Sequence, residues 1–375
     1  MPAQLFYASS ELSADVLYLS GCFIPDAFLL FIINGKKVAI LSRLEIGRAR
    51  REGDFDELLE LEALRDEVAE ATGIKRPKAE TLVKAFAEKR RLKEFVVPDD
   101  FPVGLAFKLQ ETGLKIRTED EPPVPQRLRK TDLEARHIAE GNRASAAGLH
   151  AAEKMLREAT IEGSRLLHNG KALTSERLRE AVDTAVLGRG AVASQTICAC
   201  GKQACDPHNR GSGPLRPHEL IIVDVFPRVS KTGYHGDMTR TFLKGRPNDA
   251  QRRLVETVRS GQQAALAKIK PGVDARTVHQ AVVEHFEAEG YATEERKGTW
   301  VGFFHSTGHG LGLEVHEEPR ISKFKGTRLK SGLVFTVEPG LYYPGIGGCR
   351  IEDVVRVTSE GYEMLSKYPY RWHLR

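Results

Sequence analysis

The spacing of apolar and polar residues predicts a small α/β unit at the start of the chain. Residues 28–33 and 36–41 are two mainly apolar runs. The pair between them, Asn34-Gly35, accepts the positive φ angles of a two-residue turn. The segment is therefore expected to form a β-hairpin.

Apolar residues at helical spacing follow the predicted hairpin. Residues 54–72 are expected to form a helix that Asp54 caps and Gly73 ends. Residues 75–93 are rich in Lys and Arg, and a solvated helix face is favoured there over a patch that binds anions or nucleic acid. The inward side chains of that second helix would be Leu82, Ala85 and Phe86.

An acidic, proline-rich stretch separates this unit from the rest of the chain. Residues 119–126 contain three prolines, which fit neither a helix interior nor a central strand. We therefore place one domain at residues 1–122 and a second, which holds every candidate catalytic residue, at 127–375. The helices predicted in the second domain cover residues 131–159, 175–187, 249–269 and 274–289, and the strands cover 197–199, 220–226, 238–243 and 333–337.

Composition narrows the class of protein. The 375 residues carry a net charge of only +5, which indicates no nucleic-acid partner. No apolar run approaches the length of a membrane span, and the N-terminus lacks the pattern of a secretory signal. Five cysteines in a chain of this length do not suggest a disulfide framework. We expect a cytoplasmic protein with no membrane partner.

Two aspartates mark the first part of a candidate site. Asp224 interrupts the apolar run at 220–226, where a buried carboxylate is costly unless it is paired or bound to a metal. Its alternative role is an ion pair, for instance with Arg240. Asp237 follows across a predicted hairpin, which would return the second carboxylate beside the first. Residues 239–241 then supply donors that could orient Asp237.

A glycine-rich stretch and two glutamates complete the candidate site. His309 lies between two glycines, with His305 four residues before it and His316 seven after it. Glu338 and Glu352 stand at or in apolar strands. Two Asp, one His and two Glu form an oxygen-dominated ligand set that suits two divalent ions. Two such ions can activate a bridging water for hydrolysis.

Cys198, Cys200, Cys205 and His208 form a separate cluster with two possible meanings. One is a structural zinc site. The spacing is irregular and no second cysteine pair lies nearby. We therefore favour small buried cysteines beside a functional His208.

These motifs resemble the pita-bread metallopeptidases, family M24, which include methionine aminopeptidase, aminopeptidase P, prolidase and creatinase. The resemblance covers roughly residues 130–370. It is carried by Asp224, Gly-Asp237-Met-Thr-Arg-Thr-Phe, Thr-Gly-His309-Gly-Leu-Gly-Leu-Glu-Val-His316-Glu-Glu-Pro, Thr-Val-Glu338-Pro-Gly-Leu-Tyr and Arg350-Ile-Glu352-Asp. It implies an α+β chain, in which a smaller N-terminal α/β domain precedes a curved sheet flanked by helices in two related halves.

The resemblance implies two divalent ions, which could be Mn, Co, Zn or Fe. Asp237 and Glu352 would bridge both ions. Asp224 would complete the coordination of one ion, and His309 with Glu338 would complete the coordination of the other. The chain departs from the family in one spacing, because its two aspartates are thirteen residues apart and the family usually has eleven. Two extra residues in the intervening hairpin would explain the difference.

Catalytic and substrate-binding roles follow from the same resemblance. Glu338 would carry the proton of the attacking water. His208 and His316 would hold the substrate and stabilise the tetrahedral intermediate, a place where donors to the developing oxyanion are needed. His305 and Arg350 match positions that bind the substrate.

The activity implied is cleavage of the bond before proline in a peptide, by a prolidase or an aminopeptidase P. Methionine aminopeptidase normally lacks the large preceding domain, and creatinase lacks the ligand set. Two alternatives stay open: an inactive pita-bread scaffold that binds peptides or proteins, and a related hydrolase with a non-peptide substrate. The family also suggests a homodimer. The preference between dipeptides and longer peptides is left open by the sequence.

Overall fold

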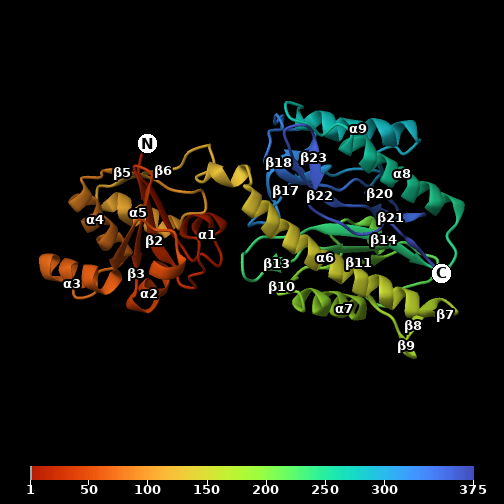
Figure 1. Cartoon of the computed structure of the whole chain (residues 1–375), viewed down its shortest axis with the longest axis horizontal. Coiled ribbons are helices and arrows are strands. Elements are labelled where there is room, and N and C mark those ends of the chain that lie inside the picture. The colour runs from red at the N-terminus through yellow and green to blue at the C-terminus, as the bar shows by residue number, and fades with distance from the viewer. Residues whose placement is uncertain (1) are drawn as a thin grey trace. The chain divides into compact units, whose positions relative to one another are not determined.

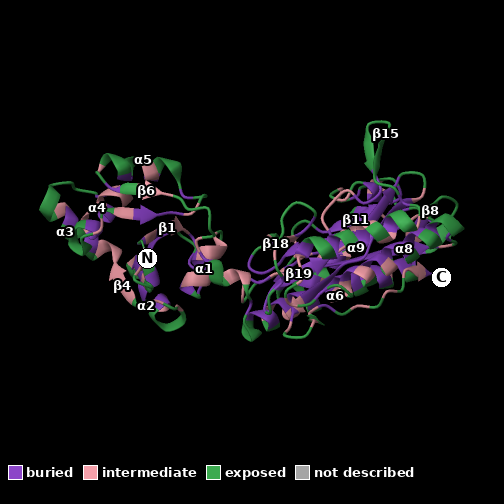
Figure 2. Ribbon diagram, turned by 90° about the horizontal axis from the view of Figure 1, so that it is seen from above, coloured by how far each residue is buried: buried purple, intermediate pink, exposed green. Residues whose placement is uncertain are grey.

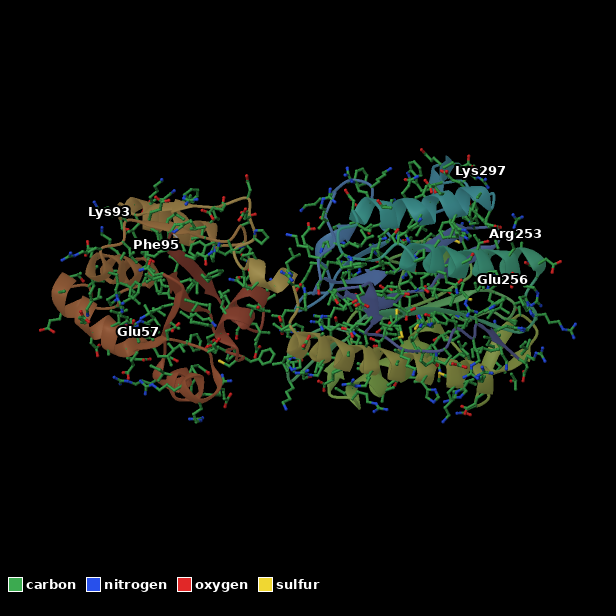
Figure 3. All side chains as sticks on the ribbon, turned by 45° about the horizontal axis from the view of Figure 1, so that its top comes forward. Glu57, Lys93, Phe95, Arg253, Glu256 and Lys297 are labelled. Carbon is green, nitrogen blue, oxygen red and sulfur yellow. The ribbon has the colours of Figure 1, made fainter. Side chains whose placement is uncertain are left out.

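The computed structural model describes residues 2–375 and divides the chain into two compact units, Met1–Arg127 and Leu128–Arg375 (Figure 1). Side chains fill the space between sheets and helices inside each unit (Figure 3). Residues 118–124 form neither helix nor strand, and the 3-10 helix η1 (Pro125–Leu128) follows them. The division between the units therefore falls just after the acidic, proline-rich stretch.

The first unit is built on a mixed six-stranded sheet with the strand order β4-β3-β2-β1-β5-β6. β2 is antiparallel to both of its neighbours, and the other adjacent strands are parallel. The strands are β1 (Gln4–Ala8), β2 (Phe28–Ile33), β3 (Lys36–Leu41), β4 (Glu57–Glu60), β5 (Glu94–Val96) and β6 (Lys115–Arg117). The helices are α1 (Ala14–Ser20), α2 (Arg43–Glu52), α3 (Leu61–Thr72), α4 (Ala79–Arg90) and α5 (Val103–Glu111).

The hairpin prediction is confirmed and the helix prediction at 54–72 is wrong at its start. Asn34 and Gly35 have φ angles of 53° and 79°, as a tight turn between β2 and β3 requires. Residues 57–60 form β4, which pairs with β3, so that α3 begins only at Leu61. Asp54 pairs with Lys37 and caps no helix. The leucine spacing suits both structures, and pairing with the edge of β3 decides for the strand.

The basic segment at 75–93 contains α4 over Ala79–Arg90, and the outer face of this helix is solvated as expected. Lys89 on that face pairs with Glu67 at 3.1 Å. Ala85 is partly buried and packs against the same apolar cluster as Leu82 and Phe86, in agreement with its predicted inward position. The buried side chains of α4 are Leu82, Val83, Phe86 and Ala87.

The second unit packs four helices against two main sheets. One sheet has the order β11-β12-β14-β24, and the other has the order β18-β17-β19-β22-β23. The helices are α6 (Asp132–Glu158), α7 (Ser175–Leu187), α8 (Asp249–Leu266) and α9 (Ala275–Ala288). The strands of the first sheet are β11 (Ile197–Cys200), β12 (Ile221–Val225), β14 (Met238–Lys244) and β24 (His373–Leu374). Those of the second are β17 (Gly308–Gly310), β18 (Glu317–Ile321), β19 (Val334–Val337), β22 (Asp353–Val357) and β23 (Tyr362–Met364).

Shorter elements complete this unit. They are β7 (Thr160–Glu162), β8 (Arg165–His168), β9 (Lys171–Ala172), β10 (Ala191–Val192), η2 (Gln203–Cys205), β13 (Arg228–Val229), β15 (Glu294–Arg296), β16 (Thr299–Val301), β20 (Gly340–Tyr343) and β21 (Gly347–Arg350). The predicted long helix begins at a capping box, in which Thr131 and Glu134 satisfy each other's backbone N–H groups. Within residues 2–375 no helix combines the length and apolar character needed to cross a bilayer.

The cores lie between the sheets and the helices. Figure 2 shows buried residues concentrated in the strands of the second unit and exposed residues on the outer faces of its helices. One apolar cluster lies under α8 and α9, and another lies between α6, α7 and the β11-β12-β14 sheet. The expected α+β fold is confirmed, and the polar residues that these two sheets bury define the site.

Candidate metal centre and active-site pocket

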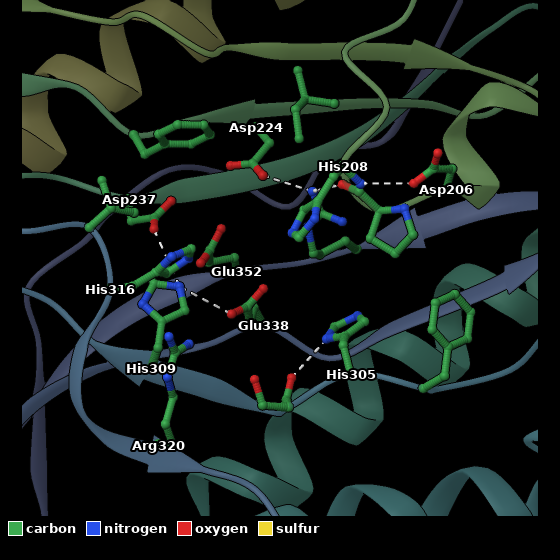
Figure 4. A pocket seen from close by; sticks show the side chains of 17 residues that line it. Asp206, His208, Asp224, Asp237, His305, His309, His316, Arg320, Glu338 and Glu352 are labelled. Carbon is green, nitrogen blue, oxygen red and sulfur yellow. Dashed lines mark hydrogen bonds and ion pairs between the residues drawn. The ribbon is translucent and has the colours of Figure 1, made fainter. Parts of the chain in front are cut away.

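The side chains that the sequence predicts for the site all line one cavity of about 600 Å³ (Figure 4). They come from both main sheets and from the loops beside them. The set consists of His208, Asp224, Asp237, His305, His309, His316, Glu338, Arg350 and Glu352. Residues far apart in the sequence therefore share one pocket.

The hairpin of β12 and β14 supplies the two aspartates. Asp224 lies on β12 opposite Thr239 of β14, and Asp237 immediately precedes β14. The backbone N–H of Asp237 donates to Asn142 Oδ1 at 3.0 Å, which ties this end of the strand to α6. The hairpin thus returns the second carboxylate beside the first, as the sequence predicts.

A contact between two glycines permits this approach to α6. The backbone of Gly236 lies directly against that of Gly141, and a Cβ added to either glycine would fall inside the backbone of the other. A side chain at either position would push Asp237 away from the helix.

The second sheet supplies the remaining acidic and histidine ligand candidates. His309 lies in β17, Glu338 follows β19, and Glu352 precedes β22. β19 pairs with both β17 and β22, so the three side chains emerge at neighbouring places. The glycines that flank His309 face the backbones of Thr336 and Glu318 so closely that a Cβ at either position would clash.

Three groups lie at distances that suit a single metal ion. Ligand atoms of Asp237, His309 and Glu352 all lie within 4.8 Å of one another, and all three residues are buried. His309 Nε2 lies 3.3 Å from Glu338 Oε1 and 3.7 Å from Asp237 Oδ2. Asp224 Oδ1 is buried with no hydrogen-bond partner in the described chain. A buried carboxylate oxygen without a partner is costly, and a cation would satisfy it.

Electrostatics favours a cation at the same place. Burial, followed by the charges of Asp224 and Glu338, raises the pKa of Asp237 well above its ordinary value. Burial and the charge of Asp237 do the same to the pKa of Glu352. Burial, followed by the charge of Asp224, raises the pKa of Glu338 to about 7. Burial lowers the pKa of His309 to about 3, so its ring is neutral and able to coordinate a metal. The donor set therefore fits divalent metal ions.

Two contacts between the ligand candidates and the residues behind them differ from the predictions. Thr239 Oγ1 donates to Glu352 Oε2 at 2.6 Å, so it orients Glu352 and not Asp237. Asp224 does not pair with Arg240. Arg350 contacts Asp224 Oδ2 at 2.7 Å. Arg240 binds a different carboxylate, that of Asp353, at 2.9 Å, because its side chain points away from the cavity behind Glu352.

Three histidines surround this centre. The ring of His316 lies edge-on to that of His309, with ring centres 4.4 Å apart. His305 Nε2 lies 2.9 Å from the Tyr342 hydroxyl, and burial lowers the pKa of His305 to about 3, which keeps it neutral. His208 lines the cavity from the loop after η2 (Figure 4). Donors therefore face the acidic cluster from two sides.

Sequence reasoning missed Arg320 as a residue of the pocket. Arg320 lies in β18 directly opposite His309, and its side chain lines the cavity. Its position four residues after His316 was visible in the sequence, but only the strand register places it beside the site. Apolar side chains that sequence reasoning also missed form part of the wall: Ile197, Phe226, Phe304 and Val315.

The cysteine cluster has no zinc geometry. Cys198 and Cys200 lie in one hydrophobic cluster, whereas Cys205 lies in another with Ala199. Burial raises the pKa of all three thiols, which disfavours the thiolate that zinc requires. In the part of the chain that the structure describes, the one group of three or more metal-binding side chains is Asp237, His309 and Glu352.

Comparisons with known proteins identify the family of the chain. Residues 136–359 match the model of metallopeptidase family M24. An Xaa-Pro dipeptidase of Pyrococcus furiosus is 31% identical over 363 residues, which cover 94% of this chain and 91% of that protein. A prolidase structure from Pyrococcus horikoshii superposes with a TM-score of 0.79 at 25% identity, covering 99% of this chain and 95% of that one. An X-Pro aminopeptidase structure from Thermotoga maritima gives a TM-score of 0.81 at 23% identity, covering 100% and 97% of the two chains.

Proposed function

The chain belongs to metallopeptidase family M24, and on that premise we propose that it hydrolyses the peptide bond before proline, with dipeptides as its preferred substrates. The observation that carries the proposal is the meeting of the five acidic and histidine ligand candidates with three further histidines in one cavity. The likeness to an Xaa-Pro dipeptidase along almost the whole chain supports the same substrate class.

We propose that two divalent ions are held by Asp224, Asp237, His309, Glu338 and Glu352. When bound, such ions lower the pKa of water and polarise the scissile carbonyl. Carboxylate-rich ligation accepts Mn, Co, Zn or Fe, and we propose manganese as the first to test. The ligand assignment is supported by the short separations among Asp237, His309 and Glu352 and by the 3.3 Å between His309 and Glu338. Burial also raises the pKa values of the Asp237, Glu338 and Glu352 carboxyl groups, and Asp224 has a buried oxygen without a partner in the described chain.

The protein's own groups then have separate tasks. Glu338, whose burial favours accepting a proton, takes one from the attacking water and passes it to the leaving proline nitrogen. His208 and His316 face the cavity from different loops and donate to the oxygen on which negative charge develops. His305, kept neutral by burial, stands against the apolar wall where a proline ring can pack.

A free carboxylate on the substrate has a partner in Arg320. Its side chain lines the cavity and forms no hydrogen bond or ion pair with residues 2–375. Arg350, the other arginine proposed to bind the substrate, also lines the cavity and already contacts Asp224, Tyr342 and Thr239. An unpaired guanidinium beside the centre suits the carboxylate of a dipeptide, which would lie close to the cleaved bond.

Assembly and compartment are also proposed. Val103 and Phe107 lie one turn apart on α5 with exposed fractions of 66% and 61%, which supports a homodimer in which the first unit takes part. The five cysteines are all free and buried, which suits the reducing cytoplasm. The mass in solution, measured by light scattering, tests the first statement.

The activity is tested with metal-stripped protein reloaded with Mn, Co, Zn or Fe. Hydrolysis of Ala-Pro, with slower or no hydrolysis of Ala-Pro-Ala, is the expected result. Preference for the tripeptide would make the protein an aminopeptidase of longer peptides. Two bound ions without cleavage of either peptide would contradict the proposal, and absence of bound ions would favour a binding scaffold.

A further inference from the structure

A buried ion pair lies at the loop of residues 311–317, which carries His316, and contributes no group to the cavity. Lys130 Nζ and Glu317 Oε2 are 2.6 Å apart, although the two residues are 187 positions apart in sequence. The exposed fractions of their side chains are 1% and 7%. Neither residue lines the pocket. Charges so deeply buried are retained only when they are paired, so the two side chains hold one another in place.

Lys130 is the fixed member of the pair. Its backbone N–H donates to the carbonyl of Gly332 at 2.7 Å. Its own carbonyl accepts from Arg356 on β22 at 3.1 Å. The residue is thus attached to the sheet that carries Glu338 and Glu352, and its ammonium group gives the loop a stationary anchor.

Glu317 closes the loop of residues 311–317. One carboxylate oxygen binds Lys130, and the other accepts from the backbone N–H of Glu314 at 3.1 Å. Gly312 packs on the same carboxylate, since a Cβ there would lie 2.7 Å from one of its oxygens. The carbonyl of Gly312 also accepts from the backbone N–H of His235, in the hairpin that carries the aspartates. The carboxylate therefore ties together the ends of the loop.

His316 depends on this loop for its position. Its ring is exposed at the cavity and has no hydrogen-bond partner anywhere in residues 2–375. It contacts the ring of His309 at 4.4 Å between centres. Without a side-chain hydrogen bond, the place of the imidazole is set by its backbone, which is continuous with Glu317.

We propose that the Lys130–Glu317 ion pair is a positioning device that fixes the backbone of residues 311–317 and thereby aims His316 at the substrate. This inference rests on the proposed function, in which His316 donates to the developing oxyanion. Lys130 and Glu317 are positioning residues and do not touch the substrate. A displacement of about 1 Å in a catalytic group is enough to lower a rate by up to about 100-fold.

The test is a double-mutant cycle. In the manganese enzyme, Glu317→Gln is expected to lower kcat for Ala-Pro by about 10- to 100-fold while the metal content stays that of the wild type. Added to His316→Ala, the same change should lower kcat no further, since both act through one imidazole. Hydrogen exchange should show faster exchange in residues 311–317 of Glu317→Gln, a readout that needs no activity.

Matched variants separate the alternatives. Glu153→Gln removes a carboxylate with a 6% exposed side chain that pairs with Arg157 in α6, away from the cavity, and should leave kcat unchanged. Gly312→Ala keeps both charges but displaces the Glu317 carboxylate, and it should repeat the kcat loss even if Glu317→Gln does not fold. A wild-type kcat in Glu317→Gln or in Gly312→Ala would overturn the inference. The same conclusion would follow if the kcat losses of Glu317→Gln and His316→Ala multiplied in the double variant. If the wild type and Glu153→Gln were both inactive, the proposed function would be refuted. Hydrogen exchange in residues 311–317 would still test whether the ion pair fixes this loop.

Discussion

Replacing Glu338 by Gln is expected to stabilise the metal-free protein at neutral pH. Glu338 is 15% exposed, and burial followed by the charge of Asp224 raises its pKa from 4.5 to about 7. A folded-state pKa above the unfolded value means that the protonated form is favoured by folding. The stability that protonation provides is complete below pH 4.5 and is lost as the pH rises to about 7.

The magnitude follows from the pKa values. Each tenfold change in proton affinity corresponds to about 1.4 kcal/mol, so ionised Glu338 destabilises the metal-free fold by about 3 kcal/mol at pH 8. A neutral Gln carries no such penalty. It also removes a charge that raises the pKa values of Asp237 and Glu352, which acts in the same direction. For a unit of this size, about 3 kcal/mol corresponds to roughly 6–12 °C in Tm.

The assay is thermal unfolding of chelator-treated wild type and Glu338→Gln between pH 5 and pH 8. The Tm of the variant should rise relative to that of the wild type across this range, and adding manganese should favour the wild type again, since the ions bind the native ligand set more tightly. Glu256→Gln, which removes an exposed carboxylate on α8, controls for the loss of one charge. A Tm difference that is the same at pH 5 and pH 8 would refute the reasoning.

Four further variants test individual side chains. Asp237→Ala should lose metal and activity together, and a fully active variant would contradict the ligand assignment. His316→Ala should keep its metal while kcat falls about 100-fold or more, as for loss of an oxyanion donor; wild-type kinetics would remove its proposed role. Arg320→Met should raise KM for Ala-Pro about 10- to 100-fold but change KM for Ala-Pro amide much less; equal effects on both would argue against a carboxylate contact. Thr239→Val should weaken metal binding about 10- to 100-fold, through the hydrogen bond to Glu352, in a calorimetric titration; unchanged affinity would show that this contact does not orient the ligand.

Local patterns predicted those parts of the fold that neighbouring residues decide. The Asn34-Gly35 hairpin and the helix at 175–187 both appear as expected, because turn chemistry and capping are short-range effects. The start of α3 was wrong since β4 exists only through its pairing with β3. Residues with the spacing of a helix can form a strand when the edge of a sheet is free to pair.

The same distinction holds for the site. The ligand candidates could be chosen from sequence because each is a carboxylate or histidine in an apolar or glycine-rich setting. Their hydrogen-bond partners could not, because a pair such as Thr239 and Glu352 is brought together only by the packing of two sheets. Arg320 was missed for a related reason, since an arginine in a polar stretch has no local sign of facing a cavity, and only its register opposite His309 places it there.

The two-sheet origin of the centre has a consequence for the order of synthesis. Thr239 and Glu352, which share a hydrogen bond at the centre, are 113 residues apart, so a ribosome adding about 5–20 residues per second takes roughly 6–23 s to make the second after the first. During that interval the hairpin that carries Asp224 and Asp237 exists without the histidine and glutamates of the other sheet. Metal capture therefore cannot guide the early folding of this unit. The full set of ligand candidates exists only after Glu352 has been made, so cellular metal supply would influence the yield of active protein more than the pathway by which this unit folds.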